Sequence, residues 1–552
     1  MRRSLLVLGA LTAVAWPASA AAAPVVVLGR HGHARVRNDP FVTGPALTPA
    51  PSSTAASPGA TAAAPGGMRA DLRTRRRAGG GAGLGGSGTV SGSTSGSAGS
   101  GGTRGSGSTG HRHRHRSHHD RGPTFLGQLA GLYRHHRIDR ATYRRTRASF
   151  RSALATERHL HGTRRTELAS VTETMHAIAA SHELIPSRLP ALVATLDANR
   201  RWWRSGPLLA ADQRVELAGS QLVWEYYPGQ GIQLQVLGTF GKADGLYTAG
   251  PDHYQQLVQL LSQMIPLAAH RGGGLAWEYY FSFDGGSPPW TSAMSQATAL
   301  EALTRAYEAT GNSSYLSVAT QALPIFSRPP PAGVAVRTRL GVRFIQYTFA
   351  PGTPILNAFL QTLIGLYDFA HVSGNQTAAS LFAAGNAEAQ AEVPSYNTGA
   401  WSLYQPGIED TLSYHELVTD FLEQLCQRTA APVYCTTGKE FQADLTTPPV
   451  ISQRTFRIRA KTPFSLRFKL SKYSHVGIVL TLGTRTVLAT SASFPYGSDS
   501  FSIPGLRTPG HYGVRLAATD LAGNFTRISG TLVVTPRGRR HRRRLGSEPS
   551  TS

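Results

Sequence analysis

The spacing of apolar residues changes once along this chain, at Thr447-Pro448-Pro449, and the change divides the folded part into two regions. Upstream of these prolines, apolar residues return every three or four positions, which is the period of an amphipathic helix. Downstream they alternate with polar residues, which is the period of a strand. We therefore expect a mainly α protein, with a helical domain over residues 123–447 followed by a small β-sandwich over residues 450–536.

Three segments carry the helical period most clearly. Two of them stop at a Gly-Asn pair, where glycine supports the left-handed backbone that commonly ends a helix. Many helices of this length, joined by short loops with aromatic residues, favour an α/α toroid or a related array of helical hairpins. The three segments are 293–307, which stops at Gly311-Asn312, 357–367, which stops at Gly374-Asn375, and 417–425.

One strand-and-turn pattern in the second region points to the type of sandwich. The alternating run from Gly510 to Leu516 is followed by Asp520-Leu521-Ala522-Gly523-Asn524. This pairing resembles the penultimate strand and turn of bacterial immunoglobulin-like modules. We expect an immunoglobulin-like domain with a structural or adhesive role.

Residues 1–23 have the layout of a signal peptide. Arg2 and Arg3 precede an apolar run from Leu5 to Trp16, and small residues follow, with cleavage expected after Ala20. The apolar run is shorter than the roughly 20 residues that a membrane-spanning helix needs. We expect a secreted or envelope-associated, extracytoplasmic protein.

The formal net charge of +25 lies mostly outside the expected domains. Residues 1–123 carry +12 and the tail 537–552 carries +5, which leaves +8 for everything between them. The composition of residues 24–122, rich in Ala, Pro, Gly, Ser, His and Arg, predicts a disordered tether. We expect no nucleic-acid partner, and we assign the tether and the tail an electrostatic association with an anionic cell envelope and no chemistry.

The chain has two cysteines, Cys426 and Cys435, nine positions apart. Two cysteines exclude a disulfide-stabilised scaffold and any multi-cysteine zinc site. In an exported protein we expect them to form a disulfide, with two buried thiols as the alternative. The imidazoles in residues 111–119 could bind a divalent metal, the alternative being a solvated charged tail, and we assign them no chemistry.

Common catalytic motifs are absent from the sequence, including phosphate-binding loops, serine elbows and zinc-binding helices. Aromatic, amide and glycine residues instead gather in four short segments. Aromatic rings beside amides suit a sugar-binding cleft, since rings pack on C–H faces and amides bind hydroxyls; the alternative is that these rings cover helix ends as core. The segments are 224–231, 277–281, 396–401 and 412–415.

Four segments match motifs of one known family, in one order. They are Trp290 to Gln296, similar to W-x-S-A-M-x-Q; Leu356 to Asp368, similar to L-N-G-F-x-x-S-L-I-G-L-Y-D; Tyr396-Asn397-Thr398-Gly399, similar to Y-D-T-G; and Ser413-Tyr414-His415, similar to D-Y-H. These motifs resemble the C-terminal domain of the D-glucuronyl C5-epimerases. The resemblance covers roughly residues 220 to 430.

The resemblance implies an isomerase that converts D-glucuronate to L-iduronate within a polysaccharide. The enzyme would remove the proton at carbon 5, alpha to a carboxylate, and return one to the opposite face. This reaction needs an acid or base on each face and a group that neutralises the carboxylate. It is redox-neutral, so we expect no cofactor, and the expected partner is an acidic polysaccharide.

Three tyrosines match family positions implicated in catalysis: Tyr347, Tyr396 and Tyr414. The resemblance implies that Tyr414 and Tyr347 transfer the protons, while Tyr396 holds the substrate or tunes one of them. A tyrosine has a pKa near 10 and must be tuned to act as a base. The animal enzymes have a carboxylate where this chain has Gln346, so tyrosine or another residue must serve as base here.

Further residues are candidates for substrate binding. Arg343, His415 and Arg271 are candidates to neutralise the carboxylate, although each could equally form a salt bridge or face solvent. Asn357 could instead cap its helix, and Tyr414 could pack in the core. The complete substrate-binding set is Gln346, Arg343, His415, Asn357, Trp290, Glu278, Trp401 and Tyr404.

Three other functions compete with epimerisation. A polysaccharide lyase would abstract the same proton and then eliminate the substituent at carbon 4. An inverting glycoside hydrolase would use Glu278 with Asp284 or Asp368 as a carboxyl pair. A non-catalytic envelope glycan-binding protein would account for the basic tails and the sandwich.

Overall fold

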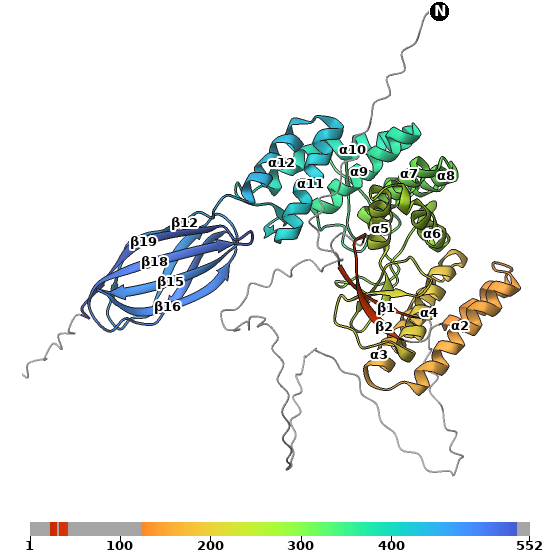
Figure 1. Ribbon diagram of the computed structural model, residues 1–552, viewed down its shortest axis with the longest axis horizontal. Coiled ribbons are helices and arrows are strands. Elements are labelled where there is room, and N and C mark those ends of the chain that lie inside the picture. Colours follow the sequence, from red (N-terminus) through yellow and green to blue (C-terminus); the bar gives the residue numbers. More distant parts are fainter. Residues whose placement is uncertain (1–22, 30–32, 42–122, 538–552) are drawn as a thin grey trace, which may run out of the picture. The chain divides into compact units, whose positions relative to one another are not determined.

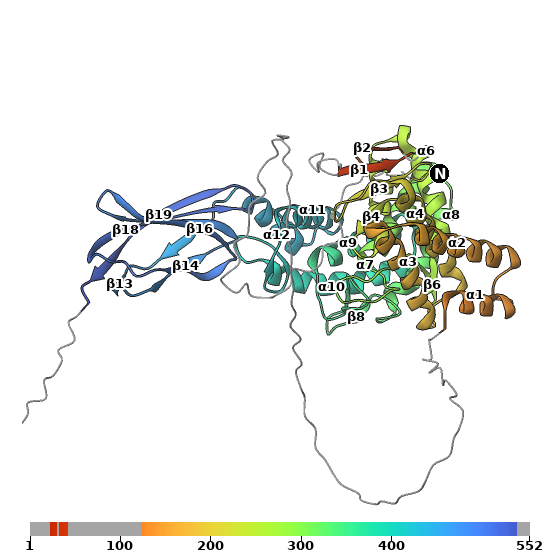
Figure 2. The same cartoon turned by 90° about the horizontal axis from the view of Figure 1, so that it is seen from below.

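The computed structural model describes residues 23–29, 33–41 and 123–537. The predicted signal peptide, most of the tether and most of the basic tail lie outside these ranges. The described part is mainly helical and has a β-rich C-terminal region (Figures 1 and 2). None of its helices has the length and apolar character needed to cross a membrane.

Most of the twelve α-helices in the described ranges form hairpins. Helices α5, α7, α9 and α11 pack each against the next. Helices α10 and α12 pack on α9 and α11, α6 packs on α5 and α7, and α8 packs on α7 and α9. Ahead of the row, α2 and α3 pack on α4. The helices are α1 (Phe125–Arg134), α2 (Arg140–His159), α3 (Gly162–Ala180), α4 (Leu189–Ser205), α5 (Val236–Thr248), α6 (Tyr254–Met264), α7 (Ala293–Thr310), α8 (Ser314–Ala322), α9 (Leu356–Ser373), α10 (Gln376–Glu392), α11 (Leu412–Thr429) and α12 (Pro432–Asp444), with short 3-10 helices at Pro186–Arg188, Pro251–His253, Ile265–Leu267, Leu323–Ser327 and Val393–Tyr396.

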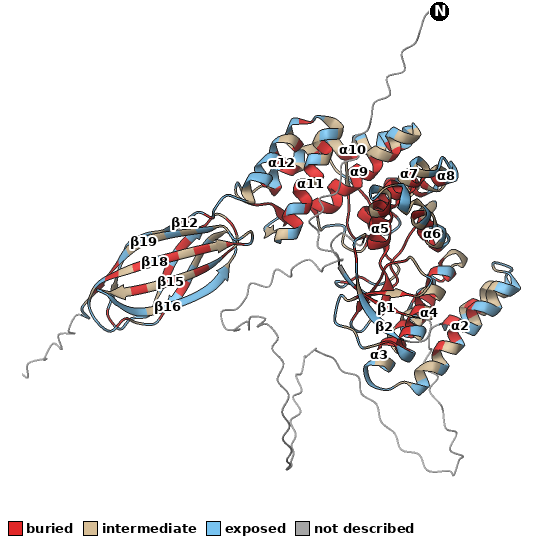
Figure 3. Cartoon of the chain, viewed as in Figure 1, coloured by how far each residue is buried: buried red, intermediate tan, exposed pale blue. Residues whose placement is uncertain are grey.

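Glycines explain where α7 and α9 end and how closely they pack. Gly311 and Gly374 follow these helices with φ of 69° and 67°, so the two predicted helix ends are confirmed. Gly365 lies on α9 where a Cβ atom would be 2.3 Å from the carbonyl oxygen of Ala297 on α7. A larger residue would force the two helices apart, and most residues of both helices are buried (Figure 3).

A five-stranded sheet precedes the row of helices, and the sequence reading missed it. Its strands lie in the order β2-β1-β3-β4-β5, with β1 parallel to β3 and the other neighbours antiparallel. Strands β4 and β5 are entirely buried. The strands are β1 (Ala23–Leu28), β2 (Ala34–Asp39), β3 (Arg214–Leu217), β4 (Trp224–Tyr227) and β5 (Gly231–Leu234).

Two sequence predictions are wrong at this sheet. The tether was expected to begin at residue 24, but β1 and β2 belong to the fold because Val25-Val26-Val27-Leu28 is buried between two neighbouring strands. Asp39 at the end of β2 then pairs with Lys242 of α5 at 3.0 Å, both side chains being buried. The run Trp224 to Tyr227, expected at a helix end, is the buried strand β4.

Three two-stranded hairpins occupy connections between the later helices. Each is antiparallel and only two or three residues long on a side. They matter because the candidate site residues lie on or beside them. The hairpins are β6 (Ala269–Arg271) with β7 (Gly274–Ala276), β8 (Ala335–Arg337) with β9 (Val342–Phe344), and β10 (Leu403–Gln405) with β11 (Ile408–Glu409).

The C-terminal region is a sandwich of two sheets around its own apolar core. One sheet has the order β12-β14-β17 and the other β13-β19-β18-β15-β16. Alternate residues of β14 and β18 point into the core, as the period of two predicted. The strands are β12 (Ile451–Gln453), β13 (Phe456–Arg459), β14 (Phe464–Leu470), β15 (Ser474–Leu482), β16 (Arg485–Phe494), β17 (Gly497–Ile503), β18 (Gly510–Asp520) and β19 (Phe525–Thr535).

The predicted disulfide is present in the structure. Cys426 near the end of α11 is bonded to Cys435 in α12. The bond therefore closes the short turn between two helices of one hairpin.

Candidate functional site

Tyr347 is held on a loop whose backbone is fixed at both ends. It lies three residues after β9, where the amide of Ala293 donates to the carbonyl of Ile345 at 3.0 Å. On its other side, the amide of Thr348 donates to the carbonyl of Thr291 at 3.1 Å. The start of α7 thus positions the loop that carries Tyr347.

Tyr404 and Tyr414 reach the same place from another part of the chain. Tyr404 is the middle residue of β10, and Tyr414 lies in the first turn of α11, where Thr411 caps the helix. Their ring centroids are 5.2 Å apart. The Tyr404 hydroxyl forms a hydrogen bond with Tyr347, and Tyr414 is close enough to Tyr347 to influence its ionisation. We call Tyr347, Tyr404 and Tyr414 the tyrosine cluster.

Burial controls the ionisation of this cluster. The three rings are 2%, 5% and 9% exposed in chain order, so Tyr414 retains the largest accessible fraction. Burial raises the pKa of Tyr347 and of Tyr404 above the usual value near 10. Hydrogen bonds from Tyr404 and Gln346 act in the opposite direction on the pKa of Tyr347. Burial is the larger effect on Tyr347, and these hydrogen bonds offset only part of it.

Aromatic rings form a wall behind Tyr347. Phe349 stacks on it with a centroid separation of 5.2 Å, and Phe283 and Trp290 lie 5.6 and 5.8 Å away. The Trp290 indole also stacks on Tyr279 at 4.2 Å and is almost fully buried. These contacts make Trp290 a fixed part of the wall.

Gln346 and Asn357, both predicted to bind substrate, are buried close to these elements. The Ser292 hydroxyl donates to Gln346 Oε1 at 3.2 Å, while the Gln346 side chain also bonds to Tyr347. Asn357 is the second residue of α9 and does not cap it, since Ile355 holds the cap position. Its Oδ1 atom is buried and has no hydrogen-bond partner among the described residues. An unpaired buried acceptor is uncommon and needs a partner such as a ligand or water.

Tyr396 makes its contacts in a different group. Its hydroxyl donates to the carbonyl of Pro354 at 3.2 Å, and its ionisation is influenced by Glu392 and Arg343 rather than by the tyrosine cluster. Arg343 Nε donates to Glu392 at 2.8 Å. Burial raises the pKa of Glu392 to about 7 despite this arginine. The structure thus groups Tyr396 with an arginine that is 27% exposed at its side chain.

Glu278 is part of a buried ion-pair network. Its carboxylate accepts from Arg188 at 2.7 Å and from Arg271 at 2.6 Å, and its side chain is fully buried. Burial alone would raise the pKa of Glu278, but the two guanidinium groups lower it. Asp368 is likewise paired with Arg428 at 2.7 Å. These pairings leave neither carboxylate free to act as the acid of a glycoside hydrolase, and they commit Arg271 to the fold.

His415 is held in a buried chain of polar groups. Asp410 is 2.5 Å from the Ser402 hydroxyl, which is 2.8 Å from His415 Nδ1, and His415 Nε2 is 2.9 Å from the carbonyl of Phe441. Trp401 stacks on the imidazole with a centroid separation of 3.7 Å. Burial lowers the pKa of His415 to about 4 and raises that of Asp410 to about 7. The ring is neutral, so it supplies no positive charge for a substrate carboxylate.

The sequence predicts Tyr404 as a substrate-binding residue, not as a member of a catalytic cluster, and it does not predict Ser402 or Asp410. The available signal was position, because Ser402 and Asp410 flank the hairpin that carries Tyr404. Within the described ranges, no group of His, Cys, Asp and Glu could hold a metal ion.

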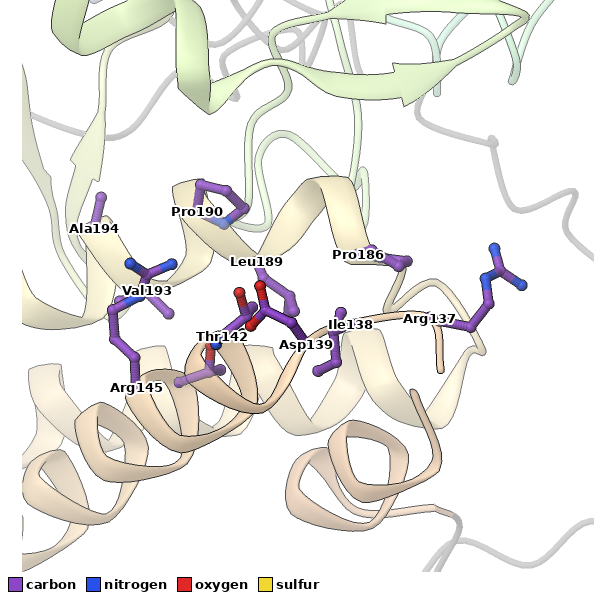
Figure 4. A pocket seen from close by; sticks show the side chains of 11 residues that line it. Arg137, Ile138, Asp139, Thr142, Arg145, Pro186, Leu189, Pro190, Val193 and Ala194 are labelled. Atoms are coloured by element: carbon purple, nitrogen blue, oxygen red, sulfur yellow. Dashed lines mark hydrogen bonds between the residues drawn. The ribbon is translucent and has the colours of Figure 1, made fainter. Parts of the chain in front are cut away.

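A hollow of about 590 Å³ lies away from the tyrosine cluster, between the starts of α2 and α4 (Figure 4).

Comparison with known proteins connects this region to one family. Residues 272–443 match the family described as D-glucuronyl C5-epimerase C-terminus. A D-glucuronyl C5-epimerase of Caenorhabditis elegans is 32% identical over 130 residues, which are 21% of this chain and 21% of the worm protein. An uncharacterised protein of Methanocaldococcus jannaschii is 33% identical over 137 residues, 24% of this chain and 44% of that one. The chain thus spans less than half the length of these relatives.

Solved structures give weaker likenesses. A sugar epimerase from a ruminal bacterium is 14% identical with a TM-score of 0.28, and the match covers 38% of this chain and 57% of that one. Cellobiose 2-epimerase from Bacillus thermoamylovorans is 9% identical with a TM-score of 0.29, covering 51% and 74%. At these scores neither structure bears on the fold or on the function.

Proposed function

Residues 272–443 belong to the D-glucuronyl C5-epimerase C-terminal family, and from this we propose that the protein inverts carbon 5 of D-glucuronate residues to L-iduronate within an acidic polysaccharide. The observation that carries the proposal is the convergence of Tyr347, Tyr404 and Tyr414 from three separate elements. Two phenol groups can remove and return a proton on opposite faces of a sugar ring. The reaction is redox-neutral and uses no electron carrier.

Tyr347 acts as the base in this proposal, and Tyr414 returns the proton. The hydrogen bonds from Tyr404 and Gln346 stabilise a Tyr347 phenolate, which is the form a base must reach. We assign the return of the proton to Tyr414, which keeps the larger exposed fraction of the two. Tyr404 positions Tyr347 and tunes it through their hydrogen bond.

The amide of Gln346 fits this assignment better than a carboxylate would. A carboxylate next to Tyr347 would repel the phenolate and raise the pKa of the tyrosine further. The amide instead donates a hydrogen bond to Tyr347 and is held by Ser292. In this chain the tyrosine takes the role that the family's carboxylate could have in the animal enzymes.

We assign substrate binding to Asn357 and to the pair formed by Arg343 and Tyr396. Asn357 Oδ1 is available to accept a hydrogen bond from a sugar hydroxyl. Arg343 is partly exposed and stands beside Tyr396, so we assign this pair to the uronate carboxylate, with Glu392 as the competing partner of Arg343. Trp290, Trp401, Glu278 and His415 support the fold around the cluster.

We also propose the finer features of the architecture and location. The successive packing of α5, α7, α9 and α11, each covered by an outer helix, supports an α/α toroid. The two-sheet core supports an immunoglobulin-like sandwich. The N-terminal signal supports action outside the cytoplasm on a glycan near the cell envelope.

The direct test is incubation with heparosan, an unsulfated glucuronate polymer, in deuterated water. NMR should show deuterium at carbon 5 and the appearance of iduronate. An ultraviolet-absorbing double bond would instead identify a lyase, and new reducing ends would identify a hydrolase. Binding without any isotope exchange would identify a glycan-binding protein.

Single substitutions test the two assigned tyrosines. Tyr347→Phe and Tyr414→Phe should each lower the exchange rate by about 100-fold or more, because each removes one acid or base. Tyr434→Phe is the matched control, since its buried hydroxyl bonds to Asn386 in the α10–α12 region at 2.7 Å. Equal rates for all three variants would refute the assignment.

A further inference from the structure

The net positive charge of residues 124–536 lies in the segment that contains the first four helices. Residues 124–205, which include α1 to α4, contain 14 arginines and six acidic residues, a net charge of +8. Residues 206–536 contain 21 basic and 21 acidic residues and are neutral. The match to the epimerase family begins later, at residue 272, so this charge is separate from the family domain.

On α2 the arginines form one continuous row. With 100° per residue, Arg140, Arg144, Arg147, Arg151 and Arg158 fall within about 60° of one another around the helix axis, along about 27 Å. Four of them are exposed and Arg147 is half-buried. The opposite side of α2 packs into the core (Figure 3). We call these five residues the arginine stripe.

The positive charge of the stripe is not neutralised by ion pairs within the described part of the chain. In the described part of the chain, none of its guanidinium groups forms an ion pair. The acidic residues Asp139 and Glu157 of this segment project from a different side of the helix. Like charges three and four residues apart destabilise a helix. An anionic partner along the stripe would relieve this repulsion.

A hollow lies on the α4 side of α2, which is not the side that carries the stripe. Arg145 and Arg137 stand at opposite ends of the hollow between α2 and α4, and its walls include Leu189, Pro190 and Val193 (Figure 4). Apolar walls suit the C–H face of a sugar, and guanidinium groups suit its carboxylate. Asp139, also in the hollow, accepts from the Thr142 amide at 2.6 Å and offsets one of the two arginines.

We propose that the arginine stripe is a second binding surface for an acidic polysaccharide, outside the tyrosine cluster. A linear polymer with regularly spaced carboxylates matches a straight row of guanidinium groups, each of which can bind a carboxylate in bidentate fashion. This inference rests on the proposed function for the identity of the polymer. The stripe holds the chain, and the tyrosine cluster acts on it.

Binding measurements with matched variants test the proposal. The stripe variant replaces Arg140, Arg144, Arg147 and Arg151 with glutamine. The control variant makes the same change at four exposed sandwich arginines that also form no ion pair among the described residues, and both variants keep the basic tether and tail. The control positions are Arg457, Arg459, Arg467 and Arg485.

Affinity for heparosan should fall about tenfold in the stripe variant at low salt and change less than about twofold in the control. Both differences should vanish near 1 M salt, where the Debye length is about 3 Å. A four-fold lysine variant of the stripe should bind more tightly than the glutamine variant and more weakly than wild type, because lysine keeps the charge but not the bidentate contact, and this separates charge loss from misfolding. Equal losses in the stripe and control variants would overturn the proposal, as would equally tight binding of the wild-type chain to DNA or to anionic vesicles.

Activity measurements separate this inference from the proposed function. The stripe variant should raise KM for long polymer while kcat and the turnover of short oligosaccharides stay unchanged. Tyr414→Phe should abolish exchange and leave polymer affinity intact. If the wild-type chain shows no exchange at all, the proposed function fails, and the affinity comparison still decides the role of the stripe.

Discussion

The arginines of the stripe on α2 differ from Arg305 and Arg428 on the later helices in whether they form an ion pair. Arg305 pairs with Asp244 at 3.0 Å and Arg428 pairs with Asp368 at 2.7 Å, whereas the arginine stripe has no carboxylate partner among the described residues. A charge withdrawn from water needs a partner, because desolvation is expensive. An exposed charge needs none and stays available to a ligand. Pairing thus separates Arg305 and Arg428, which the fold uses, from the arginine stripe, which is open to a ligand.

The largest expected loss of stability follows from removing a buried carboxylate that is paired with arginine. Glu278→Gln would leave Arg271 without an anion and Arg188 with Glu183 as its one remaining carboxylate, and should lower the free energy of unfolding by about 3–5 kcal/mol. Denaturant titration measures the loss. Glu173→Gln on α3, at an exposed position, is the control and should stay within about 0.5 kcal/mol. A similar small change in both variants would contradict the comparison.

Asp410 shows what a buried carboxyl does when it lacks an arginine: it keeps its proton. Burial raises its pKa to about 7. Between pH 4 and 7 the unfolded chain has lost this proton and the folded chain retains it, so this group makes stability fall as pH rises. His415, with its pKa lowered to about 4, acts in the opposite direction below its unfolded value near 6.5.

Asp410→Asn isolates the carboxyl from the histidine. The stability of the variant relative to wild type should increase as pH rises from 4 to 7, by on the order of 3 kcal/mol. Denaturant titrations of both proteins at several pH values measure the difference. A difference that is independent of pH would show that Asp410 ionises normally.

The smallest expected effect belongs to the exposed region. Arg144→Gln on α2 should change the free energy of unfolding by less than about 0.5 kcal/mol, because its side chain has no ion pair in the described structure and lies in water. Thermal denaturation at low and high salt checks this. If Arg144→Gln lowered the free energy of unfolding as much as Glu278→Gln, the distinction between exposed, unpaired and buried, paired arginines would be wrong.

Local patterns anticipated the elements well. The helical period and the terminal glycines located α7 and α9, and the alternating period located the strands of the sandwich. Cys426 and Cys435 were paired correctly because they are nine residues apart in one helical hairpin. These patterns depend on neighbouring residues, so they can be recognised without knowledge of the rest of the chain.

Other features depended on contacts between distant segments. The segment from Val25 to Leu28 is too short for its periodicity to predict a strand. It forms a strand because β3, almost two hundred residues later, pairs with it. Tyr396 lies in the same family motif series as Tyr414, yet its contacts are with Arg343 and Glu392. Glu278 and His415 had the chemistry of site residues but are used to satisfy buried partners.

By itself the sequence determined the main helical region, the sandwich strands, the disulfide and the resemblance to the epimerase family over roughly residues 220 to 430, because spacing and motif order are properties of neighbouring residues. Only the tertiary structure decided that Tyr347, Tyr404 and Tyr414 meet, and which charges are paired inside the fold. Those outcomes depend on burial, and burial is set by segments far apart in the chain.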